Sequence, residues 1–314
     1  MTASLTIPVS IAKDLLTGAE WSPAESRGLL QRTADIKARP SRFASVLRGK
    51  HIALIFEKPS LRTRVTFEVG IQSMGGDVVF LDHTQARLGE RESIPDVARN
   101  LECWVQGIVA RVYEQRVLEE MAASISIPVV NALSDKFHPC QALADYFTLE
   151  EKFGSLKGFK LAYVGDGNNV CHSLLFLAAR LGVNFRIATP ANYAPAPDVV
   201  ADAKRVAKET RACIELFTNP SEAVAGAQAV YTDSWTSMGF EAEEKVRRNV
   251  FKAYQVNRKL MEQAAPGAFF MHCLPAHRGA EVTDEVLDGP TSIVLKQSEN
   301  RMHVQKAILH ALYS

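Results

Sequence analysis

Short apolar runs that alternate with amphipathic segments constrain the fold of this chain more than any other feature of its sequence. The run His51–Phe56 reads as a buried strand, and the segment after it carries Leu61, Val65 and Val69 at helical spacing. Such alternation is typical of an α/β fold, with helices on both faces of a parallel sheet. The strands that we expect on this basis are 51–56, 78–81, 108–110, 128–131, 160–164, 183–188, 229–231, 268–271 and 292–295.

The length of the chain, 314 residues, favours two domains, each with a sizeable core. A helix is predicted over Pro139–Phe153, and Gly154 and Gly158 follow it. We place the domain boundary within this helix, which gives domains of similar size at 1–147 and 148–298. Two further helices are predicted near the chain ends, one after the capping box Ser22-Pro23-Ala24-Glu25 and one over Glu299–Leu312.

The composition is that of a soluble globular protein. A formal net charge of +1 gives no sign of attraction to nucleic acid or to a membrane surface. The five cysteines form no CxxC pair, which fits a reducing compartment better than a disulfide framework. No apolar run reaches transmembrane length, and the N-terminus lacks the pattern of a signal peptide. We therefore expect a soluble cytoplasmic protein.

The segment Phe56–Arg64 combines a strand end, a tight turn and a helix start. Ser60 is placed to be the N-cap, and the first backbone N–H groups of such a helix attract anions. Arg62 and Thr63 add a bidentate cation and a hydroxyl donor. The segment therefore predicts a phosphate site; the alternative is an ordinary capped helix with solvated arginines. Arg111 ends another predicted strand, at the sheet edge where ligands of such folds bind.

The turn Gly165–Asn169 occupies the place of a dinucleotide fingerprint but lacks its third glycine, because Val170 stands there. One interpretation is a structural turn that uses glycine for a positive φ. The other is a contact with a small ligand through Asn168 or Asn169, which we favour over a nucleotide site.

Further polar side chains follow other predicted strands. His138 and Gln141 lie one helical turn apart and can share a ligand, although a histidine of this kind is more often structural. Asp233 and Ser237 are spaced either to recognise an amino group or to cap the next helix. Cys273 is either a small core residue or part of a site. Their shared placement just after strands favours a role in binding.

An ordered set of motifs across most of the chain resembles the aspartate/ornithine transcarbamylase family. The closing segment Glu299–His303 is similar to that of the ornithine-specific members. The resemblance implies a carbamoyl-phosphate domain at 1–147, to which the C-terminal helix 299–314 returns, and an ornithine domain at 148–298. It also implies a homotrimer or a multiple of it, with active sites at subunit borders. The motifs that carry the resemblance are Phe56-Glu-Lys-Pro-Ser-Leu-Arg-Thr-Arg64, His138-Pro-Cys-Gln141, Asp233 with Ser237-Met-Gly239, and His272-Cys-Leu-Pro275.

The resemblance also assigns roles to individual residues. Arg62, Arg111, His138, Cys273 and Arg301 would be catalytic, with Cys273 a contact rather than a covalent nucleophile. The carbamoyl-phosphate residues that it implies are Ser60, Leu61 through its backbone N–H, Arg62, Thr63, Arg111, His138, Gln141, Cys273, Leu274 and Arg301. The ornithine residues that it implies are Asn169, Asp233, Ser237 and Met238.

Two positions depart from the family pattern. Leu61 replaces the first threonine of the usual Ser-Thr-Arg-Thr turn, as a bulky apolar residue also does in some relatives that use acylated ornithines. Arg87 stands in the loop 82–92, where ornithine enzymes often provide a glutamine to the neighbouring subunit's site. Both positions bear on which amine accepts the carbamoyl group.

The predicted reaction is attack of the neutral δ-amine of ornithine on the carbamoyl carbon, giving citrulline and phosphate. This chemistry depends on positioning and charge stabilisation, and it requires no metal or organic cofactor. Transfer to N-acylated ornithine, putrescine or aspartate is the alternative within the family, against which Asp233 and Ser237-Met-Gly239 argue. Other classes are a nucleotide-binding oxidoreductase, disfavoured by the missing third glycine, and a non-catalytic relative, disfavoured by the intact arginine set.

Overall fold

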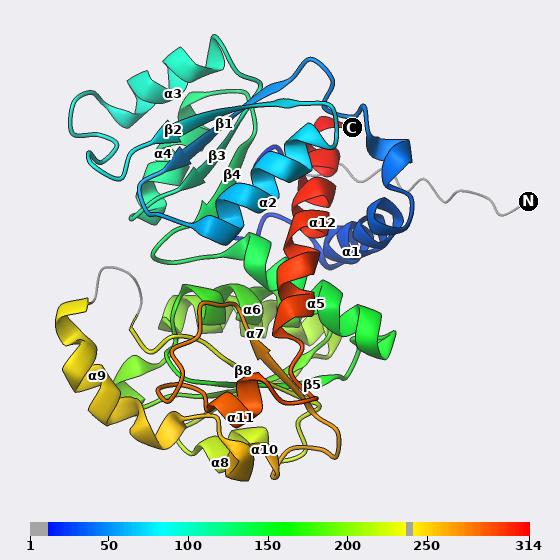
Figure 1. Cartoon of the computed structure of the whole chain (residues 1–314), viewed down its shortest axis with the longest axis vertical. Coiled ribbons are helices and arrows are strands. Elements are labelled where there is room, and N and C mark those ends of the chain that lie inside the picture. The colour runs from blue at the N-terminus through cyan, green and yellow to red at the C-terminus, as the bar shows by residue number, and fades with distance from the viewer. Residues whose placement is uncertain (1–11, 237–240) are drawn as a thin grey trace, which may run out of the picture. The chain divides into compact units, whose positions relative to one another are not determined.

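A computed structural model describes residues 12–236 and 241–314 and divides the chain into two compact units. The first unit contains the chain up to Asp135 together with Arg301–Ser314, and the second contains Lys136–Asn300. Each unit is built on one parallel sheet (Figure 1). The predicted α/β fold class is therefore confirmed.

The first unit has a sheet in the order β2-β1-β3-β4, in which all neighbouring strands are parallel. The capping box predicted at the start of α1 is present, with Ser22 and Glu25 bonded to each other's backbone. The elements of this unit are α1 (Pro23–Ala38), the 3₁₀ helix η1 (Pro40–Phe43), β1 (His51–Phe56), α2 (Leu61–Gln72), β2 (Asp77–Asp82), α3 (Ile94–Glu102), β3 (Gly107–Arg111), α4 (Gln115–Ser124) and β4 (Val129–Leu133).

The second unit has a parallel sheet in the order β7-β6-β5-β8-β9. Its helices and strands are α5 (Pro139–Phe153), β5 (Lys160–Val164), α6 (Asn169–Leu181), β6 (Asn184–Ala188), α7 (Pro197–Thr210), β7 (Ile214–Phe217), α8 (Pro220–Val224), β8 (Ala229–Thr232), α9 (Glu244–Phe251), α10 (Arg258–Met261), β9 (Phe269–His272), α11 (Asp284–Leu287) and α12 (Val294–Tyr313). The described residues of this unit also form the 3₁₀ helices η2 (Ala191–Tyr193), η3 (Glu241–Glu243) and η4 (Lys252–Tyr254). The last part of α12, from Arg301, belongs to the first unit.

The prediction of a final strand at 292–295 is wrong. Ser292 makes only an isolated parallel bridge to Phe270, and α12 begins at Val294. A short apolar run does not by itself distinguish a strand from a buried helix start, and here Leu295 is 77% exposed. The strand β7 was not predicted, because its residues are largely exposed and lack an apolar run.

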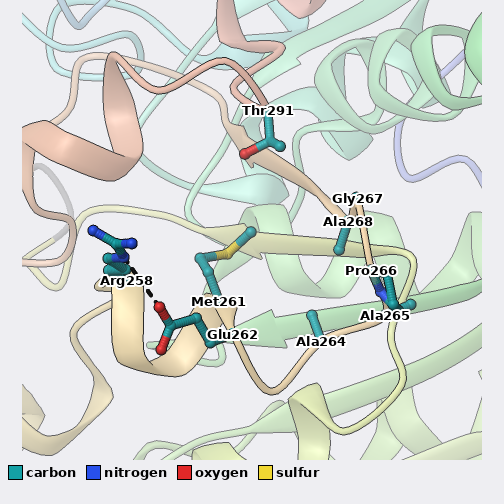
Figure 2. A pocket seen from close by; sticks show the side chains of 9 residues that line it. All are labelled: Arg258, Met261, Glu262, Ala264, Ala265, Pro266, Gly267, Ala268 and Thr291. Atoms are coloured by element: carbon teal, nitrogen blue, oxygen red, sulfur yellow. Dashed lines mark hydrogen bonds and ion pairs between the residues drawn. The ribbon is translucent and has the colours of Figure 1, made fainter.

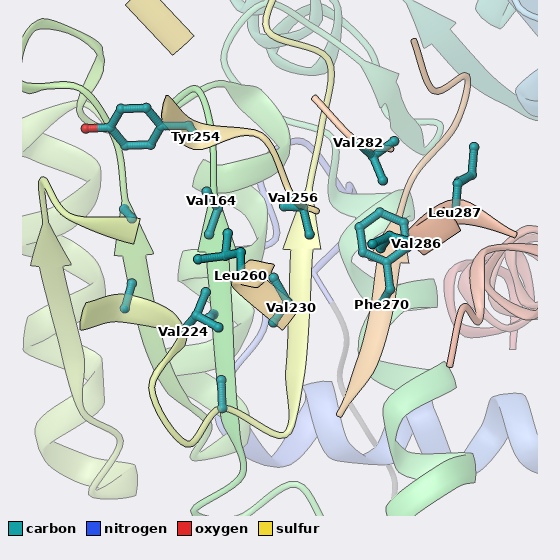
Figure 3. Close-up of a cluster of buried hydrophobic side chains, with 14 of the residues drawn as sticks. Val164, Val224, Val230, Tyr254, Val256, Leu260, Phe270, Val282, Val286 and Leu287 are labelled. Carbon is teal, nitrogen blue, oxygen red and sulfur yellow. The ribbon is translucent and has the colours of Figure 1, made fainter. Parts of the chain in front are cut away.

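The core of each unit lies against its sheet. In the first unit, Ala53 and Ile55 of β1 pack with α3 and α4 residues, while Ile52 and Leu54 on the opposite face are also fully buried. Burial on both faces is typical of doubly wound sheets. Figure 3 shows the corresponding cluster of the second unit, which combines side chains of β5, β8 and β9 with those of α8, α10 and α11.

The strand orders create one topological switch point in each sheet. The chain leaves β1 for β2 on one side and later adds β3 on the other, so the switch lies between β1 and β3. In the second sheet the corresponding switch lies between β5 and β8. Beyond the carboxyl ends of such paired strands is a crevice that commonly holds ligands in open α/β sheets.

Candidate functional site

The first group of predicted site residues lies at the switch point between β1 and β3. Phe56 and Arg111, the last residues of these strands, are paired in the register, and Glu57 N–H donates to the Arg111 carbonyl at 2.9 Å. Arg111 is 7% exposed. The turn after β1 and the end of β3 are therefore adjacent, as parallel pairing requires.

The N-terminus of α2 forms one wall of this group. Ser60 is its N-cap and accepts a hydrogen bond from Thr63 N–H at 3.3 Å. Leu61 is the first helical residue, so its N–H has no acceptor within the helix, while its side chain is 75% exposed. Thr63 is buried, and its hydroxyl accepts a hydrogen bond from Arg301 Nη2 at 2.6 Å. The turn thus combines helix-end N–H groups with hydroxyls and an arginine.

Glu57 holds the loops around this group together. Its carboxylate is 2% exposed and accepts hydrogen bonds from the N–H groups of Leu88 and Tyr113, both at 2.8 Å. These bonds engage both oxygens of the carboxylate. Because backbone donors compensate its negative charge, Glu57 joins these loops without leaving an uncompensated carboxylate beside Arg111.

Lys58 is a buried cation that the sequence prediction did not assign. Burial, with Arg111 acting in the same direction, lowers the pKa of the Lys58 ammonium to about 8. Its Nζ lies 4.3 Å from the centre of the Tyr113 ring, and the Arg87 guanidinium lies 4.1 Å from the same ring. Arg87, which was predicted to contribute to a neighbouring subunit's site, thus lies over Tyr113 of its own chain. The sequence signal for Lys58 was its place just after β1.

The second group lies at the switch point between β5 and β8. Asn168 caps α6 and donates from Nδ2 to Asp233 Oδ2 at 2.8 Å. Asp233 Oδ1 accepts from the N–H of Ser234 at 2.8 Å and from the Cys273 thiol at 2.9 Å. Asn169, the next residue of the turn, is 8% exposed. The ends of three strands thus meet around one carboxylate.

His138 and Gln141 begin α5 in the second unit. The His138 N–H donates to Ser173 Oγ at 2.7 Å. Gln141 is 1% exposed and donates from Nε2 to Asp145 Oδ1 at 2.8 Å, whereas its buried Oε1 has no hydrogen-bond partner within the described residues. Asp145 also accepts from the Tyr231 hydroxyl at 2.9 Å. The amide of Gln141 is therefore oriented with its oxygen available as an acceptor.

A cluster of potential metal ligands lies at the ends of β8 and β9, where the ligand atoms of Asp233, His272 and Cys273 are within 4.8 Å of one another. His272 Nδ1 accepts from the Leu274 N–H at 2.8 Å, so Nε2 carries the proton and donates to Glu281 at 3.2 Å. With both ring nitrogens engaged, the histidine orients the Leu274 backbone, whose φ is 60°. The arrangement fits a structural histidine better than a metal ligand.

The predicted residues thus fall into two groups, one in each unit. Ser237 and Met238 lie outside the described residues. Sequence reasoning missed Lys58 and Asp145, whose contacts with Tyr113 and Tyr231 join segments far apart in the chain. The first unit contains Ser60, Leu61, Arg62, Thr63, Arg87, Arg111 and Arg301, and the second contains His138, Gln141, Asn169, Asp233, Cys273 and Leu274.

A separate surface pocket lies around α10 (Figure 2), where Arg258 and Glu262 form an ion pair at 3.0 Å. None of the predicted site residues lines it. Among the helices of the described segments, none combines the length and the apolar character needed to cross a bilayer.

Two family profiles match consecutive parts of the chain. The profile described as aspartate/ornithine carbamoyltransferase, carbamoyl-P binding domain, matches residues 13–151. The profile described as aspartate/ornithine carbamoyltransferase, Asp/Orn binding domain, matches residues 157–312. Together they cover both units.

Similar proteins are known from several organisms. The chain is 47% identical over 307 residues to an ornithine carbamoyltransferase of Thermococcus kodakarensis, with 96% of each chain covered. It is 46% identical over 307 residues to an anabolic ornithine carbamoyltransferase of Pyrococcus furiosus, again with 96% of each covered. The solved structure of an ornithine carbamoyltransferase from Pyrococcus furiosus matches with a TM-score of 0.92 at 46% identity, covering 96% of this chain and 97% of that one.

Proposed function

Because the chain belongs to the aspartate/ornithine carbamoyltransferase family, we propose that it transfers the carbamoyl group of carbamoyl phosphate to the δ-amine of L-ornithine. The observation that carries this proposal is the full-length similarity to proteins named ornithine carbamoyltransferase. The products are L-citrulline and phosphate. N-acylated ornithine and putrescine are disfavoured as acceptors, because the names of these relatives give ornithine as the substrate.

Carbamoyl phosphate binds through the first unit in this proposal, within the predicted domain 1–147 and the helix 299–314. The phosphate accepts hydrogen bonds from Ser60, the Leu61 N–H, Arg62 and Thr63, with Arg111 between the phosphate and the carbonyl oxygen. The contact between Thr63 and Arg301 supports this assignment, since it joins two of the predicted groups directly. Helix-end N–H groups and guanidinium donors suit a phosphate dianion.

The carbamoyl group is oriented by His138, Gln141 and Arg301. The orientation of Gln141 supports a more specific role than polarising the carbonyl: its Oε1 accepts from the carbamoyl NH₂, because its Nε2 is committed to Asp145. His138 and the arginines then serve the carbonyl oxygen, where negative charge develops in the tetrahedral transition state.

Ornithine binds through the predicted domain 148–298, with Asn169, Asp233, Ser237 and Met238 as its contacts. The neutral δ-amine attacks the carbamoyl carbon and forms the N–C bond. The C–O bond to phosphate then breaks, and phosphate leaves with the bonding electrons and takes up the proton that the amine releases. Cys273 and Leu274 line the reacting carbon, with the Cys273 thiol held by Asp233 rather than acting as a nucleophile.

We also propose an anabolic, cytoplasmic homotrimer or a multiple of it. The name of the Pyrococcus furiosus relative supports the anabolic role, and five cysteines without a CxxC pair fit a reducing compartment. An exposed apolar stripe along α2, formed by Leu61, Val65 and Val69, supports contact with another copy. Val65→Asp should then reduce the assembly measured by sedimentation velocity, whereas an unchanged assembly would contradict the use of this stripe.

A panel of acceptor amines tests the proposed reaction. The purified protein is incubated with carbamoyl phosphate and L-ornithine, N-acetylornithine, putrescine or L-aspartate, and ureido products are measured colorimetrically. We expect product with ornithine alone. A product with another amine and none with ornithine would overturn the assignment of the acceptor and direct attention to Leu61.

A further inference from the structure

Arg247 is the buried arginine of α9, a helix whose other charged residues face solvent. Its Nη1 donates to Asp166 Oδ2 at 2.8 Å and to the Trp235 carbonyl at 3.0 Å, and its Nε donates to Glu243 Oε2 at 2.9 Å. The guanidinium also lies 4.9 Å from the centre of the Tyr193 ring. One side chain thus joins three segments that lie far apart in the sequence, as the planar fork of arginine permits.

Two of these segments carry the predicted ornithine residues. Asp166 lies in the turn between β5 and α6, which continues into Asn168 and Asn169. Trp235 lies two residues after Asp233, and Asn168 Nδ2 bonds to Asp233 Oδ2 at 2.8 Å. The turn and the segment after β8 are therefore joined twice, once directly through Asn168 and once through Arg247.

The ion pair between Arg247 and Asp166 lies in a buried setting, since each residue is 8% exposed. Burial raises the pKa of the Asp166 carboxyl to about 6, opposed by Arg247 and reinforced by the nearby carboxylates of Asp233 and Glu243. Removing the arginine would leave two carboxylates, Asp166 and Asp233, without this compensating charge. Loss of one partner of a buried pair is strongly disruptive, because the other charge stays buried.

We propose that Arg247 and Asp166 are positioning residues for the acceptor amino acid, which hold the turn bearing Asn169 and the segment bearing Asp233 in one fixed arrangement. This inference rests on the proposed function and deepens it, because neither residue contacts the substrate in the proposed mechanism. Their effect is therefore specific to ornithine binding and leaves the carbamoyl-phosphate residues of the first unit undisturbed.

Steady-state kinetics of Arg247→Ala with both substrates varied tests the proposal. We expect the KM for ornithine to rise at least about tenfold, as displaced binding groups produce, with the KM for carbamoyl phosphate within about twofold of wild type. Arg247→Lys keeps the charge but loses the fork, so it should recover part of the loss. Arg248→Ala removes the adjacent exposed arginine and should behave as wild type.

An unchanged KM for ornithine in Arg247→Ala, or an equal rise of both KM values, would overturn the positioning role. If Arg247→Ala does not fold, Asp166→Asn and Glu243→Gln carry the test, since each removes one charge from the contact and keeps its size. Both should raise the KM for ornithine by a smaller factor, and wild-type values in both would refute the proposal. A wild-type protein that makes no citrulline would instead refute the proposed function, and this inference with it.

Discussion

The two switch points of this protein use the same strand arrangement to gather side chains of opposite charge. Beyond β1 and β3 the charged groups are mainly cations, with Lys58 and Arg111 buried and Glu57 compensated by backbone donors. Beyond β5 and β8 the carboxylates Asp166 and Asp233 lie close together, and the buried Arg247 pairs with Asp166. In the proposed function, the topology provides the place for each substrate, and the residues near the strand ends select an anion in one unit and an ammonium group in the other.

Removing a cation from the first switch point should have the largest effect. Arg111→Ala is expected to reduce turnover by a factor of about 100 or more, because the arginine stabilises charge that develops in the transition state. The measurement is citrulline formation, with circular dichroism to verify the fold. Arg99→Ala, an exposed arginine of α3, is the control. Near-normal turnover in Arg111→Ala would contradict the proposed role of the residues at the switch point between β1 and β3.

Removing the carboxylate from the second switch point should affect the other substrate. Asp233→Asn is expected to raise the KM for ornithine about tenfold to hundredfold, because a charged hydrogen bond to the amino acid is lost. The KM for carbamoyl phosphate should stay near wild type. Asp202→Asn, an exposed carboxylate of α7, is the matched control. Equal effects on both substrates would show that the two groups do not divide the substrates as proposed.

Asp145 of the second unit provides a test through protein stability instead of kinetics. It is fully buried, and Oδ1 accepts from the side-chain amides of Gln141 and Gln297 while Oδ2 accepts from the Tyr231 hydroxyl. Asp145→Asn converts one acceptor into a donor and should lower the free energy of unfolding by about 1–3 kcal/mol. Urea unfolding measures this change. A loss no greater than that of Asp202→Asn would contradict the importance of the network.

The smallest expected effect comes from the titration of Lys58. Because its pKa is lowered to about 8, the ammonium loses its proton as the pH rises, and the KM for carbamoyl phosphate should increase a few-fold from about pH 7 to about pH 9. Lys58→Arg keeps its charge over this range, so its KM should stay flat. A parallel rise in both proteins would assign the pH dependence to another group.

The same shift has a defined sign for the stability of the unliganded protein. Between a pH of about 8 and the ordinary lysine pKa of 10.5, the unfolded chain keeps the Lys58 proton that the folded protein has lost. Because the unfolded state then binds more protons, this residue's contribution to stability rises with pH in that window. If the predicted pH dependence of the KM is observed, a rise in pH weakens binding of carbamoyl phosphate while it stabilises the unliganded fold, and both effects come from the same ammonium group.

Local patterns in the sequence were sufficient for most of the fold. Strands such as His51–Phe56 are short apolar runs bounded by turn residues, so both their type and their ends follow from composition. The strand β7 lacks this signal because its side chains are mostly exposed, and its place depends on pairing with β6. The start of α12 is mistaken for a strand because the short apolar run 292–295 is compatible with both a strand and a helix.

The site was predictable only in part. Arg111 ends a strand, and Ser60 and Asp233 lie within a few residues of strand ends, so all three can be found from that placement together with the family motifs. Asp145 and Arg247 give no such signal, because their partners lie far away in the sequence and only the folded chain brings them together.

Gly167 lies close to another segment of its own chain, and this contact is a further argument against a dinucleotide at the turn after β5. A side chain at this position would lie 2.3 Å from the backbone nitrogen of Pro195, and the Gly167 N–H donates to the Tyr193 carbonyl at 2.9 Å. In a dinucleotide fold the comparable glycine leaves room for a pyrophosphate to approach the backbone. Here the chain fills that room with its own segment 193–195. Redesign toward a nucleotide cofactor would therefore have to remove this segment before any third glycine could help.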